Sequence, residues 1–79
     1  MTLDVRLRFV VCVESGPSPG WDSDYPTFAA AERRARELVQ QHPSWWVQVN
    51  RDGICLATVR TDAFERVWTD LDTMNPLFA

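Results

Sequence analysis

The chain has 79 residues, enough for one domain with a single core but not for two. It carries eleven acidic and eight basic residues, giving a formal net charge of −3, and every basic residue is an arginine. This balance argues against a dedicated nucleic-acid-binding domain, which normally shows a strong basic excess. We therefore expect one domain over residues 1–79 that does not bind nucleic acid directly.

The cysteines and the N-terminal stretch suggest a compartment. Cys12 and Cys55 lack C-x-x-C spacing, and neither has a histidine beside it. Asp4, Arg6 and Arg8 interrupt the first apolar stretch, unlike a signal peptide. No apolar run approaches the roughly 18 residues that a membrane span needs. We expect a cytoplasmic protein with reduced thiols, and leave open whether the two cysteines lie close enough to pair.

Residues 3–14 alternate between apolar and polar side chains, which predicts a β-strand with one face in a core. The expected core face carries Leu3, Val5, Leu7, Phe9, Val11 and Val13. Residues 15–26 contain two glycines and three prolines, so we expect them to form a long loop.

Residues 27–42 show the period of an amphipathic helix. Thr27 stands where its hydroxyl would cap the first turn, and Pro43 would end the helix. The expected apolar stripe consists of Phe28, Ala31, Ala35, Leu38 and Val39.

Residues 44–61 predict a β-hairpin around Asp52-Gly53, the dipeptide favoured in a type I′ turn. A two-residue turn sets Val49 opposite Leu56. The expected core face is then Trp45, Val47, Val49, Ile54 and Leu56, and the opposite face is Trp46, Gln48, Asn50, Cys55, Ala57 and Val59. A different loop length would exchange the faces of one strand.

Residues 62–74 are predicted to form a second helix. Asp62 and Glu65 resemble a capping box, and an apolar stripe of Phe64, Val67, Trp68, Leu71 and Met74 follows. Asn75-Pro76 would end this helix and leave a tail at 75–79. The predicted fold is α+β, in the order β-α-β-β-α, with a three-stranded sheet and two amphipathic helices on one face. The strand order stays open, and the second sheet face is left uncovered.

Catalysis is not expected, because the necessary side chains are missing or misplaced. His42 is the only histidine, and both cysteines map to the sheet face opposite the helices. The sequence contains no glycine-rich phosphate loop and no metal-ligand spacing. We expect a non-enzymatic protein with no catalytic residues, no metal and no cofactor.

Two surfaces are candidates for binding a partner. The first is the uncovered sheet face, because exposed tryptophan and arginine are typical of interface hot spots. Its expected residues are Arg6, Arg8, Trp46, Gln48 and Asn50. The second is an acidic edge suited to a basic partner. Its expected residues are Trp21, Asp22, Asp24, Asp62, Glu65, Asp70 and Asp72. The alternative for the sheet face is that Trp46 covers its neighbours or the arginine stems and has no partner. The alternative for the acidic edge is an ordinary solvated surface.

In architecture and size, the chain resembles the small inhibitors of the anti-CRISPR type that phages and mobile elements encode. The features that carry this resemblance are the strand LRFVVCVE, the alanine-rich helix FAAAERRARELV and the D-G hairpin. The resemblance implies a protein that sterically blocks a large basic nucleoprotein complex in the host cytoplasm. It has no diagnostic residues, so no site is carried over. The alternative is a structural protein that forms a small homo-oligomer through its sheet face or edge.

Overall fold

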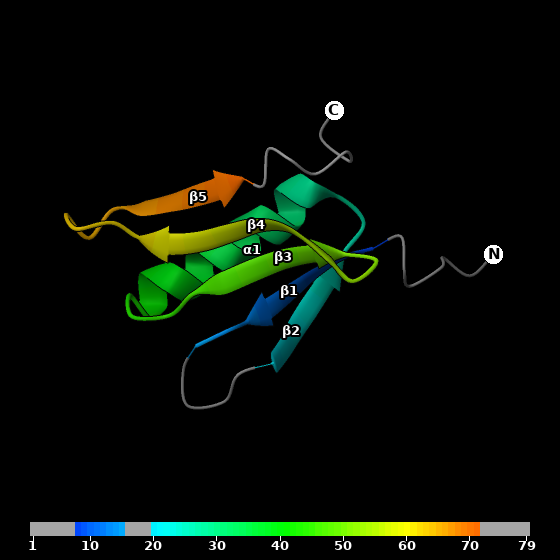
Figure 1. Cartoon of the computed structure of the whole chain (residues 1–79), viewed down its shortest axis with the longest axis horizontal. Helices are drawn as coiled ribbons and strands as arrows, with labels where there is room; N and C mark the ends of the chain where they lie inside the picture. Colours follow the sequence, from blue (N-terminus) through cyan, green and yellow to red (C-terminus); the bar gives the residue numbers. More distant parts are fainter. Residues whose placement is uncertain (1–7, 16–19, 72–79) are drawn as a thin grey trace.

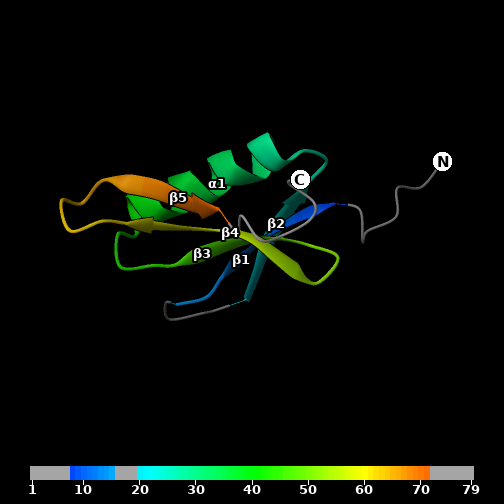
Figure 2. The ribbon, with the colours of Figure 1, turned by 45° about the horizontal axis from the view of Figure 1, so that its top comes forward.

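The computed structural model describes residues 8–15 and 20–71. Five strands form one antiparallel sheet in the order β2-β1-β3-β4-β5, and one helix lies along one side of it (Figures 1 and 2). The elements are β1 (Phe9–Val13), β2 (Gly20–Tyr25), α1 (Phe28–Gln41), β3 (Val47–Arg51), β4 (Ile54–Thr61) and β5 (Val67–Leu71). The prediction of a three-stranded sheet with two helices is therefore wrong, because two expected non-strand segments are strands.

Strand β1 confirms, for residues 9–13, the predicted strand with one face in the core. Val11 and Val13 are buried under α1, and Phe9 packs against the same cluster. Leu3, Val5 and Leu7 lie outside the described residues. The side chains at even positions of β1 therefore point to the opposite side of the sheet.

Strand β2 falls within the predicted loop 15–26, of which residues 16–19 are not described. It is an edge strand, paired only with β1, and Asp22 is an extra residue between the pairs Val11–Ser23 and Cys12–Trp21. Glycine, acidic residues and bulges are tolerated at sheet edges, where one side of the backbone needs no partner. The glycine and proline content of residues 15–26 therefore predicted a loop where β2 is stabilised by pairing with β1.

Helix α1 agrees with its prediction. The Thr27 hydroxyl accepts a hydrogen bond from the Ala30 amide at 3.2 Å, as an N-cap does. The helix ends at Gln41, and the amide of the next residue, His42, donates to the Leu38 carbonyl. The buried side of α1 is formed by Ala31, Ala35, Leu38 and Val39, with Phe28 packed beside them.

The β3–β4 hairpin has the predicted turn but not the predicted faces. Arg51 pairs with Ile54 around Asp52-Gly53, both of which have positive φ. A bulge then shifts the register, so that Val49 pairs with Ala57 instead of Leu56. One extra residue reverses the face of everything beyond it.

As a result, Ala57 and Val59 are buried beneath α1, and their predicted place on the uncovered face is wrong. Val47 and Val49 are in the core as predicted, whereas Ile54 is 44% exposed. Leu56, at the bulge, is also buried but is not part of the cluster that α1 covers.

Residues 62–71 form a tight turn and β5 where a helix was predicted. The Asp62 carboxylate accepts hydrogen bonds from the amides of Phe64 and Arg66, at 2.8 and 2.9 Å. Glu65 adopts φ 61°, and its amide donates to the Asp62 carbonyl. Three-residue hairpin loops often combine these features, a turn followed by a left-handed residue. Asp62 thus caps backbone amides as expected, but of a hairpin turn. Met74 and the predicted tail 75–79 lie outside the described residues.

Helix α1 is attached to β5 by polar contacts. The Arg36 guanidinium donates to the Val67 carbonyl at 3.2 Å, and the Thr69 hydroxyl donates to Glu32 at 2.6 Å. Glu32 and Arg36 also lie 3.6 Å apart. The single helix thereby reaches the edge strand, and it covers one sheet face.

Candidate functional site

The sheet face opposite α1 is the candidate site, and we call it the open face. Figure 2 shows α1 along the other side of the sheet. Because Val47, Val49, Ala57 and Val59 point toward α1, the residues alternating with them point away. By the strand registers, the open face carries Arg8, Val10, Cys12, Trp21, Asp24, Trp46, Gln48, Asn50, Cys55, Thr58, Arg60, Trp68 and Asp70.

Three of these side chains form a row across neighbouring strands, which we call the Trp–Arg–Trp row: Trp46, Arg60 and Trp68. The Arg60 guanidinium carbon lies 4.9 Å from the Trp68 ring centroid and 5.8 Å from that of Trp46. Both indoles remain accessible, with 54% of Trp46 and 39% of Trp68 exposed. The row therefore offers two aromatic surfaces and a cation to solvent.

Strand pairing explains why these three residues meet. Arg60 pairs directly with Trp68 across β4 and β5, and the pair Val47–Val59 brings the preceding Trp46 level with Arg60. Directly opposed side chains in an antiparallel sheet approach to about 5 Å, close enough for a guanidinium to lie over a ring. Each exposed contact of this type contributes about 0.5–1 kcal/mol. The row is thus held in place before any partner arrives.

Arg60 differs from most described arginines in what it contacts. Arg8, Arg34, Arg36 and Arg66 each lie within 3.6 Å of a carboxylate oxygen. Within residues 8–15 and 20–71, no such carboxylate lies within 4.0 Å of Arg60, whose contacts are the two indoles. Its charge is therefore not neutralised by a described acidic side chain.

The sequence correctly placed part of this face. Gln48 and Asn50 lie on it by the strand register, and Arg8 and Trp46 lie on it through their contacts with Asp24 and Arg60, while Arg6 lies outside the described residues. Arg8 is engaged by Asp24 at 3.2 Å. Sequence reasoning missed Arg60 and Trp68, although the alternation of Val67, Thr69 and Leu71 with Trp68 and Asp70 was a usable period-two signal.

The expected acidic edge is not assembled into one surface. Trp21, Asp22 and Asp24 lie on β2, at one edge of the sheet, and the remaining described members lie on the β4–β5 hairpin at the opposite edge. Those members are Asp62, Glu65 and Asp70, while Asp72 falls outside the described residues. The charges are therefore dispersed.

Ion pairing also neutralises part of this acidic set. Arg34 donates two hydrogen bonds to the Asp22 carboxylate, at 3.0 and 3.3 Å, and Ser23 donates a third at 2.6 Å. These donors, Arg34 above all, hold the pKa of Asp22 below its ordinary value. Hydrogen bonds from the Arg66 and Phe64 amides lower the pKa of Asp62 in the same way. Such carboxylates fasten the fold and are poor candidates for contacting a partner.

The two cysteines of the open face, Cys12 and Cys55, are separate free thiols. Burial raises the pKa of the Cys12 thiol, and the nearby Glu14 carboxylate raises it further. A protonated thiol is a weak nucleophile. Strand β3 separates Cys12 from Cys55 by two strand spacings, about 10 Å, and both thiols are free. This separation exceeds the roughly 7 Å limit for a disulfide.

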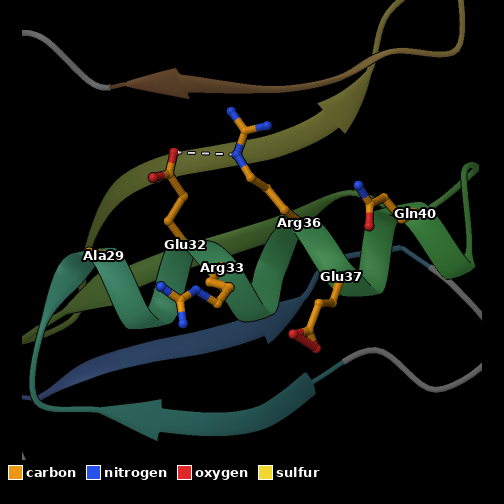
Figure 3. Close-up of a pocket in the computed structure, with 6 residues that line it drawn as sticks. All are labelled: Ala29, Glu32, Arg33, Arg36, Glu37 and Gln40. Carbon is orange, nitrogen blue, oxygen red and sulfur yellow. Dashed lines mark ion pairs between the residues drawn. The ribbon is translucent and has the colours of Figure 1, made fainter.

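Two further features lie away from the Trp–Arg–Trp row, the His42 imidazole and a hollow over α1. His42 stacks on Trp45, with ring centroids 3.7 Å apart, away from both cysteines' strands. A hollow of about 460 Å³ lies over the outer surface of α1, lined by Ala29, Glu32, Arg33, Arg36, Glu37 and Gln40 (Figure 3). Its two acids and two arginines balance in charge. Among the described residues, no three His, Cys, Asp or Glu side chains gather to hold a metal.

The chain matches no protein-family model, no curated protein and no solved structure. Within the described ranges, no helix has the length and apolar character needed to cross a membrane.

Proposed function

We propose that this chain is a protein-binding domain that docks on its partner through the open face. The observation that carries the proposal is the Trp–Arg–Trp row. Tryptophan and arginine dominate the residues whose truncation costs most binding energy at protein interfaces. Rigid, pre-positioned side chains lose little conformational entropy on binding, which favours affinity.

Binding without a reaction is the mode of action that this face supports. Its described residues offer aromatic surfaces, hydrogen-bond donors and one cation with no carboxylate within 4.0 Å, and burial raises the pKa of its Cys12 thiol. A small domain of this kind acts by covering a surface of its partner. Steric inhibition of a larger complex, which the architectural resemblance implies, is one form of this function.

Affinity capture with matched arginine variants tests the proposal. Arg60→Glu reverses the charge in the row, whereas Arg33→Glu makes the same change on the outer surface of α1. We expect a protein partner to be retained by the wild type and by Arg33→Glu and to be lost with Arg60→Glu. Circular dichroism of both variants shows that the fold persists. Equal retention by both variants would contradict docking through the open face.

Homo-oligomerisation through the β5 edge is a second candidate, favoured by a different observation. The Asp62 amide donates to the Arg66 carbonyl, so alternation directs the backbone groups of Val67, Thr69 and Leu71 away from β4. Of these, the Val67 carbonyl already accepts from Arg36, which leaves the groups of Thr69 and Leu71 for a further strand. The β5 pairing is regular, unlike that of the bulged edge strand β2. A regular edge is a template for another strand.

Light scattering of wild type and Thr69→Pro tests this second candidate. Proline removes an amide that points outward, so β5 can keep its hydrogen bonds to β4. An edge-paired oligomer would fall to the monomer mass with Thr69→Pro. A wild-type monomer across the accessible concentration range would eliminate the candidate.

A further inference from the structure

We propose that the open face recognises an acidic peptide segment, whose carboxylate binds Arg60 while apolar side chains on either side pack on Trp46 and Trp68. This inference rests on the proposed protein-binding function and names its ligand chemistry. It starts from the charge of Arg60, for which the described part of the chain supplies aromatic contacts and no carboxylate within 4.0 Å.

The stacked arrangement favours a carboxylate as the missing partner. A guanidinium that lies over aromatic rings uses its flat faces, while its N–H groups point outward in the plane of the group. A carboxylate accepts two such N–H groups in parallel, which makes this pair strong and directional. The Arg60 cation and a peptide carboxylate are therefore complementary in charge and in geometry.

The flanking indoles define the rest of the segment. Trp46 directly precedes β3 and Trp68 lies in β5, the strands on either side of β4, so their backbones lie about 9.6 Å apart, two strand spacings. A polyproline II segment advances about 9.3 Å in three residues and returns to the same side. Apolar residues three positions apart would each meet an indole. A glutamate between them projects about 120° to one side, and its long side chain would reach Arg60 from there. Covering the row in this way removes water from the ion pair and strengthens it.

The other charges on this face favour one carboxylate over a polyanion. Glu14 follows Cys12 by one alternation and donates its amide to the Trp46 carbonyl, and Asp70 follows Trp68 on the same side by one alternation. A single carboxylate at Arg60 avoids both acids. A nucleic acid carries a phosphate at every nucleotide and would place some of them beside Glu14 or Asp70. The pattern of charge therefore selects a peptide, although bases also stack on tryptophan.

Titration of intact protein with two synthetic peptides tests the inference, with tryptophan fluorescence and the indole N–H signals in NMR as readouts. One capped, proline-flanked peptide contains Leu-Glu-Glu-Leu, and the matched peptide contains Leu-Gln-Gln-Leu. We expect the glutamate peptide to bind wild type about tenfold or more tightly than its match, as for charge-assisted hydrogen bonds. Trp46→Ala should weaken both peptides, while Trp21→Ala, on the same face but outside the row, should not.

The arginine variants make the outcome specific. Arg60→Met should abolish the preference for glutamate over glutamine, and Arg33→Met on α1 should leave it unchanged. No binding of the glutamate peptide, or equal binding of both peptides, would overturn the inference, as would tighter binding of a short oligouridylate. The proposed function would survive any of these results if Arg60→Glu alone still lost its protein partner. It would fail together with the inference if that partner were retained.

Discussion

Arg60 lies directly opposite Trp68 across strands β4 and β5, and its guanidinium carbon is 4.9 Å from the centroid of the Trp68 ring. This pairing joins a strand expected from the sequence to one that was predicted to be a helix. It also completes the row that begins at Trp46. The candidate site therefore depends on a fold feature that local sequence did not reveal.

Truncating Arg60 should cost stability as well as binding. Arg60→Ala removes two exposed cation–π contacts, each contributing about 0.5–1 kcal/mol, so we expect the free energy of unfolding to fall by about 1 kcal/mol. Urea unfolding measures this change. Arg33→Ala, on the exposed surface of α1, is the matched control and should stay within about 0.5 kcal/mol of wild type. Equal losses in both variants would contradict the stacked row.

The turn at residues 62–66 makes a prediction that separates a hairpin from a helix. Glu65 has φ 61°, a conformation that costs a non-glycine residue about 1–2 kcal/mol. Glu65→Gly should therefore raise the free energy of unfolding, by about 0.5–1 kcal/mol after the entropy of the unfolded glycine is counted. In a helix, the same change would lower stability by a similar amount. Thermal or urea unfolding gives the sign, and destabilisation would count against the turn.

The helix predicted at 62–74 shows where local reasoning fails. Val67, Trp68 and Leu71 suit a helical stripe as well as a strand, and the Asp62–Glu65 spacing matches a capping box. What decides between them is pairing with β4, which joins residues that sequence alone does not place side by side. β-Branched and aromatic residues in 67–69 favour the strand, but only when a neighbouring strand is present.

The register of β4 can be tested at Val59. It is fully buried under α1, whereas its neighbour Thr58 points to the open face. Val59→Ala should lower the free energy of unfolding by about 1–3 kcal/mol, because it leaves a cavity in the core. Thr58→Ala should change stability by about 0.5 kcal/mol or less. A larger loss of stability with Thr58→Ala than with Val59→Ala would instead support the register expected without a bulge.

The same strand shows how far turn chemistry carries a prediction. Asp52-Gly53 correctly specified the turn and the first pair, Arg51 with Ile54. A bulge adds one residue without a strong signal in the sequence, and it moved Ala57 and Val59 into the core. Trp46 directly precedes β3, a strand with no extra residue, so its place on the open face was predictable, while that of Arg60 beyond the β4 bulge was not.

The Asp22–Arg34 pair predicts a dependence of stability on pH. Hydrogen bonds from Arg34 lower the folded-state pKa of Asp22 below the unfolded value of about 3.9. The pair therefore stabilises the fold above about pH 4, and this contribution is lost as pH falls through the folded-state pKa. Asp22→Asn should lower stability by about 1 kcal/mol at neutral pH.

Urea unfolding of wild type and Asp22→Asn at neutral and acidic pH checks this prediction. The difference in the free energy of unfolding between the two proteins should shrink once the pH is about one unit or more below 4. Asp52→Asn, in the exposed β3–β4 turn, is the control and should run parallel to wild type. A constant difference between wild type and Asp22→Asn at every pH would rule out the ion pair as its cause.

Indole N–H signals in a proton–nitrogen NMR titration with the captured protein partner test docking through the open face most directly. Trp46 and Trp68 report on the row, while Trp45 packs against the core and stacks on His42, so it is an internal control. We predict that the signals of Trp46 and Trp68 shift or broaden on binding and that the Trp45 signal does not. Unchanged signals from both row tryptophans, with shifts confined to α1, would contradict the account.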